Sequence, residues 1–332
     1  MPQQPHSRRS SRRRRRKTGC GFCLFAVLVL SCAVWIVFKH NAPPQAASSL
    51  SAPLPSSTPI PTPTPTPLPL VQLDESAVAS THALLLDTAG HVLWQKGSAD
   101  EPVYPASITK IMTALVALEH LPDLEQEVTM PLEIYQPLFD QNASMAGFWA
   151  GESPTVRDLL YGTMLPSGAE ASTALALAAA GDEATFVQWM NDKAAALGMC
   201  STHFANVWGI HQEGHVSTLR DLSVLLNAAL QNETLRAVMS TSSYTTAPLS
   251  AHPNGVGMQH SALSRLETPP AGFSLLGGKT GFTDEAGMCL ASFAQKANQE
   301  FRLITTGAMT TDTSVPLHVL DAITIYSAIE MP

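Results

Sequence analysis

Three short stretches of the chain carry residue types suited to nucleophilic chemistry: Ser107-Ile-Thr-Lys110, Ser167-Gly-Ala169 and Lys279-Thr-Gly281. A serine hydroxyl is a weak nucleophile until a base takes its proton, and a lysine can do so only while its amine is neutral. In a chain of this length one Ser-x-x-Lys is expected by chance, but Lys-Thr-Gly is expected in fewer than about one chain in ten. Their order and flanking sequences therefore favour acyl transfer through a serine ester.

The first stretch is predicted to open an amphipathic helix, because apolar residues recur at helical spacing at Ile108, Ile111, Met112, Leu115 and Leu118. Residues three apart share a helix face, so Ser107 and Lys110 can hydrogen-bond. The structural alternative for Ser107 is a plain N-cap. A capping box would have Glu or Gln in place of Lys110, and a cation in the first turn opposes the helix dipole. That field favours a neutral amine, so the lysine suits catalysis better than capping.

The elements that must position these residues follow from the apolar periodicity. Stretches 78–86 and 92–95, parted by Asp87-Thr-Ala-Gly90, predict a β-hairpin. Further helices are predicted at 155–163, 171–180, 183–197, 218–230 and 315–329, and later strands at 287–293 and 301–308. Gly198 would end the third of these helices, and Ser217 would cap the fourth. This order predicts an α+β domain: an antiparallel sheet with strands from both ends, an inserted helical lobe, and a cleft between them.

The amino terminus predicts a membrane anchor. Residues 8–17 are rich in Arg, and Gly21 to Phe38 contains no charge. About 19 residues from Cys20 span roughly 28 Å as a helix, close to the thickness of the hydrocarbon layer. We expect a basic cytoplasmic tail at 1–19 and a transmembrane segment at 20–38, with the rest outside the cell. A cleaved signal peptide is the alternative, and the small residues at 42–47 leave it open.

Residues 39–72 predict a spacer, because ten prolines lie between positions 42 and 70. A polyproline II segment rises about 3.1 Å per residue, so it can hold the next domain about 90 Å from the membrane. A proline-rich ligand for a partner domain is the competing interpretation. The catalytic domain is then expected at 73–332.

The first 40 residues and the rest of the chain differ in net charge. The first 40 residues hold nine of the 19 basic residues and no acid, so ten bases face 27 acids in the remainder, a net of −17. An acidic domain argues against nucleic acid as a partner. An anionic substrate would be captured by a local cation, for which Lys279 is the candidate.

The flanking sequences carry a resemblance to serine D-alanyl-D-alanine carboxypeptidases, the low-molecular-weight penicillin-binding proteins of peptidase family S11. The segment from Tyr104 through Ser107-Ile-Thr-Lys110 to Leu115 is similar to the family's nucleophile segment. The other matching segments are 159–168 for the second motif, 203–209 and 217–222 for the middle of the domain, and 276–287 for the third motif. The resemblance covers residues 73–332.

This resemblance implies the α+β penicillin-binding protein and serine β-lactamase-like transpeptidase fold. It further implies that Ser107 attacks the carbonyl between the two terminal D-alanines of a peptidoglycan stem peptide, with Lys110 as general base. Ser167 would relay a proton to the leaving amine. β-Lactams would acylate the same serine, and neither metal nor organic cofactor is needed.

By the same resemblance, the third motif would bind the substrate. Lys279 and Thr280 would hold the terminal carboxylate of the substrate. Next to Gly281, the Phe282 N–H would form an oxyanion hole with the N–H of Ser107.

Position 169 departs from the family pattern. The second motif usually ends in Asn, but Ala169 stands here, and the adjacent Glu170 points elsewhere on a regular helix. The departure bears on efficiency and substrate preference. A domain that binds cell-wall peptides or penicillin without turnover is the alternative function, and transpeptidation remains open. A β-lactamase is disfavoured, because no segment resembles the glutamate segment of the common serine β-lactamases.

Two further patterns leave alternatives. His211-Gln-Glu-Gly-His215 could bind zinc in a metallopeptidase, although its order is not H-E-x-x-H and Gly214 favours a loop. Cys200 and Cys289 could pair in an oxidising compartment or be buried separately, and the sequence does not decide between these.

Overall fold

The computed structural model of this chain describes residues 68–266, 272–312 and 314–332. The expected basic tail, transmembrane segment and most of the spacer lie outside these ranges. Within them, no helix is both long and apolar enough to cross a bilayer. Leu70–Val71 (β1), at the end of the expected spacer, pairs antiparallel with Ile329–Glu330 (β9) and so joins the two ends of the domain.

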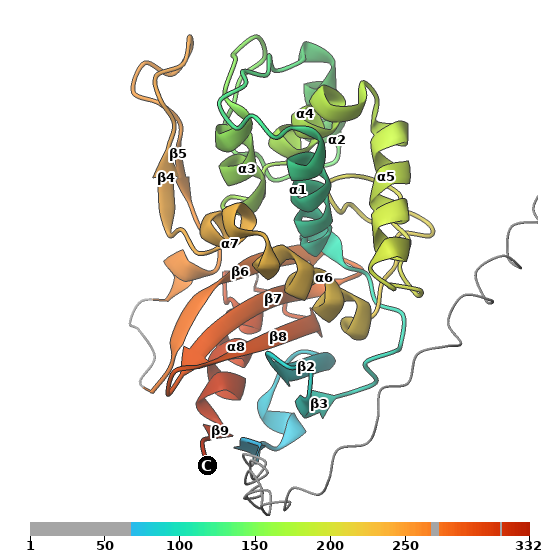
Figure 1. Cartoon of the computed structure of the whole chain (residues 1–332), viewed down its shortest axis with the longest axis vertical. Coiled ribbons are helices and arrows are strands. Elements are labelled where there is room, and N and C mark those ends of the chain that lie inside the picture. Colours follow the sequence, from blue (N-terminus) through green and yellow to red (C-terminus); the bar gives the residue numbers. More distant parts are fainter. Residues whose placement is uncertain (1–67, 267–271, 313) are drawn as a thin grey trace, which may run out of the picture. The chain divides into compact units, whose positions relative to one another are not determined.

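A five-stranded antiparallel sheet forms the centre of the domain (Figure 1), in the order β3-β2-β8-β7-β6. Its strands are β2 (His82–Asp87), β3 (Val92–Lys96), β6 (Ser274–Thr283), β7 (Gly287–Lys296) and β8 (Gln299–Ala308). The expected hairpin is β2–β3, and the expected late strands are β7 and β8. The prediction of an antiparallel sheet built from both ends of the domain is confirmed.

Strand periodicity gives the sheet two buried faces. In β2, Leu84 and Leu86 join the core beneath the helical lobe, whereas Ala83 and Leu85 join a second core. Successive side chains of a strand point to opposite faces, so one apolar run supplies both layers. The second core is closed by α8 (Leu317–Ser327), which lies on the face of the sheet opposite the lobe (Figure 1).

The helical lobe covers the other face of the sheet. Its helices are α1 (Thr109–His120), α2 (Tyr135–Asp140), α3 (Val156–Met164), α4 (Ala169–Ala180), α5 (Glu183–Ala196), α6 (Leu219–Gln231) and α7 (Glu233–Met239). The five predicted helices are confirmed with small shifts of their ends. The sequence did not predict α2, α7 or the hairpin of β4 (Ser243–Thr245) and β5 (Gly257–Gln259), which projects beside the lobe in Figure 1.

Two local expectations are corrected. α1 is not amphipathic: every residue from Thr109 to Ala117 is buried, because other helices surround it. The cap of α6 is Thr218, whose hydroxyl accepts the Asp221 N–H at 3.1 Å, and not Ser217. Ser217 is instead hydrogen-bonded to Thr202. The predicted stop of α5 is confirmed, since Gly198 follows its end with a φ of 79°.

Asp321 joins α8 to the segment that leads into β2. One carboxylate oxygen accepts the Ala79 N–H at 2.8 Å, and the other accepts the N–H and hydroxyl of Ser80 at 2.7 and 2.6 Å. Asp321 is 4 % exposed. Buried charge-assisted hydrogen bonds of this kind are costly to lose, because the donors are left without partners.

We predict that Asp321→Asn lowers the free energy of unfolding by about 2 kcal/mol, because the amide turns a donor toward a buried donor. The measurement is urea unfolding followed by tryptophan fluorescence. Asp192→Asn is the matched control: Asp192 is exposed and bonded only to Gln188, so it should change stability by less than about 0.5 kcal/mol. Equal effects of the two variants would contradict the role given to Asp321.

Candidate active site

Ser107 lies in a 3-10 turn (η2, Ala106–Ile108) that precedes α1. The turn is held between two glycines. A Cβ on Gly209 would lie 2.1 Å from the Ala106 carbonyl oxygen, and one on Gly281 would lie 3.0 Å from the Ser107 nitrogen. Ala106 has a φ of 46°, which is unusual for a residue with a side chain. Close packing therefore fixes the backbone at Ser107 against the edge strand β6.

The Ser107 side chain does not cap the helix. The N-cap position of its turn is Pro105, and that of α1 is Ile108; neither makes a side-chain cap hydrogen bond. Lys110 lies one turn along, with its Nζ 3.2 Å from Ser107 Oγ. This is the pairing expected from the three-residue spacing, and it leaves the serine hydroxyl directed at the amine.

Lys110 is 1 % exposed, and its Nζ donates to the Trp208 carbonyl oxygen at 2.6 Å. Burial disfavours the charged amine and lowers the pKa of Lys110 to about 7, although the negative charge of Glu170 acts in the opposite direction. A substantial fraction of the amine is therefore neutral near neutral pH, as a base for the Ser107 hydroxyl must be.

Glu170 does not take the place of the missing second-motif amide. Its Oε1 accepts the backbone N–H groups of Ala146, Gly147 and Phe148 at 2.6, 2.8 and 3.4 Å. Burial raises the pKa of Glu170, although these hydrogen bonds oppose that effect. The carboxylate thus anchors the 146–148 loop to the start of α4.

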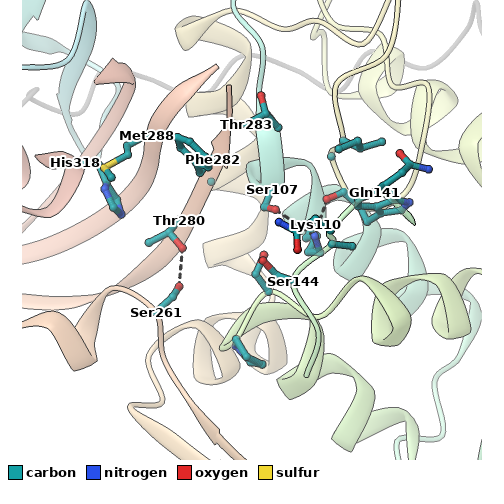
Figure 2. A pocket seen from close by; sticks show the side chains of 18 of the residues that line it. Ser107, Lys110, Gln141, Ser144, Ser261, Thr280, Phe282, Thr283, Met288 and His318 are labelled. Atoms are coloured by element: carbon teal, nitrogen blue, oxygen red, sulfur yellow. Dashed lines mark hydrogen bonds between the residues drawn. The ribbon is translucent and has the colours of Figure 1, made fainter. Parts of the chain in front are cut away.

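A cavity of about 470 Å³ opens at Ser107 and Lys110. Figure 2 shows these two residues near Ser144, with Thr280 and His318 on one side of the view and Gln141 on the other. Of the second motif, Ser167 lines the cavity with a φ of 69°. Its Oγ has no hydrogen-bond partner among the described residues.

Ala169 lies outside the cavity lining and is fully buried at the start of α4. Its N–H donates to the Ser144 carbonyl oxygen at 2.8 Å. The neighbouring Ser144 does line the cavity, so a hydroxyl is present in this part of the wall.

The third motif lies on the edge strand β6. Thr280, Gly281 and Phe282 line the cavity, and Thr280 Oγ1 is 2.6 Å from Ser261 Oγ. Lys279 lies outside the lining and is fully buried, with its Nζ donating to the Thr280 carbonyl oxygen at 2.8 Å. Burial, and then the charge of Lys110, lowers the pKa of Lys279 well below its usual value. Within the described ranges Lys279 has no acidic partner.

The structure adds residues that the sequence analysis missed: Ser144, Ser261, Arg265 and His318. Arg265 and His318 come from a short 3-10 turn after β5 and from the first turn of α8. Among the described residues, His318 Nδ1 is buried without a partner, and burial lowers the pKa of this imidazole to about 4. None of the four belongs to a recognisable motif, so only the fold reveals them.

The zinc and disulfide alternatives are addressed by direct contacts. His215 Nε2 is 2.8 Å from Thr109 Oγ1, and its Nδ1 accepts the Ala205 N–H at 2.9 Å, so protein groups occupy both ring nitrogens. Within the described ranges no group of three or more potential ligands could hold a metal. Cys200 is exposed and Cys289 is buried, and both are free thiols.

A serine paired with a buried lysine, between an antiparallel sheet and an inserted helical lobe, defines the class of serine acyl-transferring enzymes with the penicillin-binding fold. The family Peptidase_S11, D-alanyl-D-alanine carboxypeptidase, matches residues 70–310. The chain belongs to this family.

Similar proteins agree with this assignment. The chain is 32% identical over 232 residues to D-alanyl-D-alanine carboxypeptidase DacF of Bacillus subtilis (strain 168), covering 70% of this chain and 58% of DacF. It is 32% identical over 252 residues to the D-alanyl-D-alanine carboxypeptidase of Streptomyces sp. (strain K15), covering 72% of this chain and 82% of that protein. The match thus spans well under two thirds of DacF.

Solved structures support the fold. The crystal structure of the Streptomyces K15 DD-transpeptidase has a TM-score of 0.68 at 30% identity, covering 76% of this chain and 97% of that one. A D-alanyl-D-alanine carboxypeptidase from Mycobacterium tuberculosis H37Rv has a TM-score of 0.65 at 26% identity, covering 80% and 92%. The predicted α+β penicillin-binding protein fold is confirmed.

The low pKa of Lys110 leads to a pH prediction. The rate constant for acylation by a fluorescent penicillin should rise with pH below about 7 and level off above it, because only the neutral amine accepts the serine proton. The measurement is gel-based labelling over a series of pH values, with circular dichroism at each pH as the control for folding. An acylation rate that falls as pH rises through 7 would contradict the role of Lys110 as base.

Proposed function

We propose that this protein is a serine-type D-alanyl-D-alanine carboxypeptidase that removes the terminal D-alanine from peptidoglycan stem peptides. The observation that carries the proposal is the Lys110 amine, buried and 3.2 Å from Ser107 Oγ in a cavity closed by the Lys-Thr-Gly strand. Family membership supports the same activity.

The first half of the reaction forms an acyl-enzyme. Neutral Lys110 takes the hydroxyl proton as Ser107 Oγ bonds to the carbonyl carbon between the two D-alanines. The negative charge that develops on the carbonyl oxygen is met by the backbone N–H groups of Ser107 and Phe282, where one donor contributes about 10²–10³ in rate. The carbon–nitrogen bond then breaks, and the leaving amine takes the proton from Lys110, relayed through Ser167, which returns Lys110 to its neutral form. D-Alanine departs, and the acyl group remains as an ester.

The second half releases the shortened peptide. Water gives a proton to Lys110 and adds to the ester carbonyl, and the bond to Ser107 Oγ breaks as the serine regains its proton. An amine in place of water would give transpeptidation. The similar Streptomyces K15 proteins are a D-alanyl-D-alanine carboxypeptidase and a DD-transpeptidase, so the proposal includes an amine as the second acceptor.

The terminal carboxylate is held at the third motif. Lys279 is desolvated and without an acidic partner in the described part of the chain, so a carboxylate nearby stabilises its charged form. The hydroxyls of Thr280 and Ser261 offer hydrogen bonds at the cavity wall. The charge of Lys279 behind the cavity wall and the two hydroxyls on the wall together favour peptides with a free carboxyl end.

Ser107→Ala should lower D-alanine release from a diacetyl-Lys-D-Ala-D-Ala peptide by about 10³-fold or more, because no other group can carry the acyl ester. It should also abolish the covalent penicillin adduct. Free D-alanine is assayed beside Ser201→Ala, a control at an exposed serine whose side chain makes no hydrogen bond in the described structure. Penicillin labelling of the unmodified protein without D-alanine release would instead favour the binding domain without turnover, with Ala169 as its cause.

We further propose that the chain is anchored by residues 20–38, with the catalytic domain outside the cell, on the sequence pattern alone. After expression of the full chain, the protein should stay with the membrane fraction through a high-salt wash and be released only by detergent. Its intact mass should include the Arg-rich tail. A soluble mature chain beginning near Ala47 would establish the cleaved signal peptide in its place.

A further inference from the structure

A second cavity of about 550 Å³ adjoins the active-site cavity. The two share three lining residues, Gln141, Trp208 and Ile210, so the cavities adjoin along a common wall. The second cavity lies between the η3 turn (Leu132–Ile134) with α2 on one side and the 206–212 loop on the other. We call it the acidic annex, after Glu133 and Glu183, which line it.

The charged residues of the described annex lining are acidic. Its described lining contains two carboxylates and no lysine or arginine. Glu183 begins α5, and its Oε1 accepts the Val207 N–H at 3.3 Å. Burial raises the pKa of Glu183, because desolvation disfavours the carboxylate. Among the described residues neither glutamate forms an ion pair. A cation arriving here would relieve an existing electrostatic cost.

A second observation points to a ligand. Thr173, on α4, lines the annex and is 6 % exposed, and its hydroxyl has no hydrogen-bond partner within the described ranges. Buried hydroxyls nearly always have partners. The remaining wall is mixed. Ile134, Pro137, Leu138 and Leu177 are apolar, whereas Gln141, Asn206 and Gln212 are polar. An aliphatic chain with a charged donor at its end matches the apolar residues, the unpaired hydroxyl and the two carboxylates.

The charges differ on the two sides of Ser107. Lys279 is next to Thr280 in β6, and Arg265 lines the active-site cavity, whereas the annex adjoins that cavity at Gln141. Figure 2 shows Ser107 between Thr280 and Gln141. With the substrate's carboxyl end at the third motif, the annex faces the part of the peptide that becomes the acyl group. Opposite charges at the two ends fix the direction in which a peptide can lie.

We propose that the acidic annex binds the alkylammonium side chain of the residue that precedes the D-alanine pair, so that the enzyme prefers stem peptides with a free side-chain amine. This rests on the proposed function and names the substrate class of the same site. His211 also lines the annex, but its ring packs edge-on against Tyr104 at 4.7 Å, so the carboxylates are the groups that meet the cation.

The test compares two substrates that differ only in charge: Nα-acetyl-Lys-D-Ala-D-Ala with a free ε-amine, and the Nα,Nε-diacetyl peptide. The full chain should cleave the free-amine peptide with a kcat/KM about three- to tenfold higher, the range for a partly exposed ion pair. Added salt should reduce this ratio, because screening weakens the pair. A ratio of one or below overturns the proposal.

Two variants test whether the carboxylates of the annex cause the preference for the free-amine peptide. Glu183→Gln keeps the shape and an acceptor for the Val207 N–H but removes the charge, and it should bring the ratio close to one. Glu133→Gln, at an exposed position, should lower the ratio less than Glu183→Gln does. It also tests the proposal if Glu183→Gln fails to fold. Because each ratio is measured within one protein sample, the folded fraction cancels.

Glu213→Gln is the matched control. Glu213 is exposed and directly follows the 206–212 loop but does not line the annex, and the variant changes the net charge equally. It should leave the ratio as in the unmodified protein. A loss as large as that of Glu183→Gln would show that the preference comes from the overall negative charge of the domain, and it would overturn the proposed binding site. If neither peptide is cleaved, the proposed function fails; if both are cleaved at the same rate, only the annex fails.

Discussion

The desolvation of one amine is the constraint on which the site depends. A charged lysine buried without a close carboxylate costs several kcal/mol, about the size of the whole margin of stability of a domain. Lys110 is accepted in the core because its environment lets the amine be neutral near pH 7. The Trp208 carbonyl takes one hydrogen bond, and Ser107 lies at the other contact. The helix bearing this lysine must therefore be buried on all sides, which explains why α1 lacks a solvent-facing stripe.

The surrounding fold holds this arrangement by close backbone packing. The turn at Ser107 lies against Gly209 from the middle segment and Gly281 from β6. A side chain at position 209 would clash with the Ala106 carbonyl, and one at position 281 would be in tight contact with the turn. Three segments distant in the sequence thus meet at Ser107. Positive φ angles at Ala106 and Ser167 are further signs of backbone conformations held in place by tertiary contacts. Strain in these turns is tolerated because the sheet and the helical lobe close over them.

Much of the fold follows from local patterns. The sequence predicted the β2–β3 hairpin, the six longest helices and the strands β7 and β8, because strong apolar periodicity and stop signals such as Gly198 mark them. It also placed Ser107 beside Lys110, because helical spacing is a local property. It missed the burial of α1 and the contributions of Ser144, Arg265 and His318, because these depend on which loops the fold brings together. The acidic annex also depends on the fold: nothing in the sequence marks Glu133 or Glu183, and they line one cavity only because the fold brings η3, α5 and the 206–212 loop together.

The surroundings of Ala169 explain how the site accommodates alanine where the second motif usually has Asn. Ala169 is buried at the start of α4, and its N–H is bonded to Ser144, while Glu170 holds the 146–148 loop by three backbone N–H groups. The second motif and this loop are therefore one packed unit, and the loop brings the Ser144 side chain into the cavity wall. Loss of an amide at 169 does not leave the wall apolar. The same Glu170 acts on Lys110 through its charge, so the segment that lost the motif's amide still influences the protonation of the base.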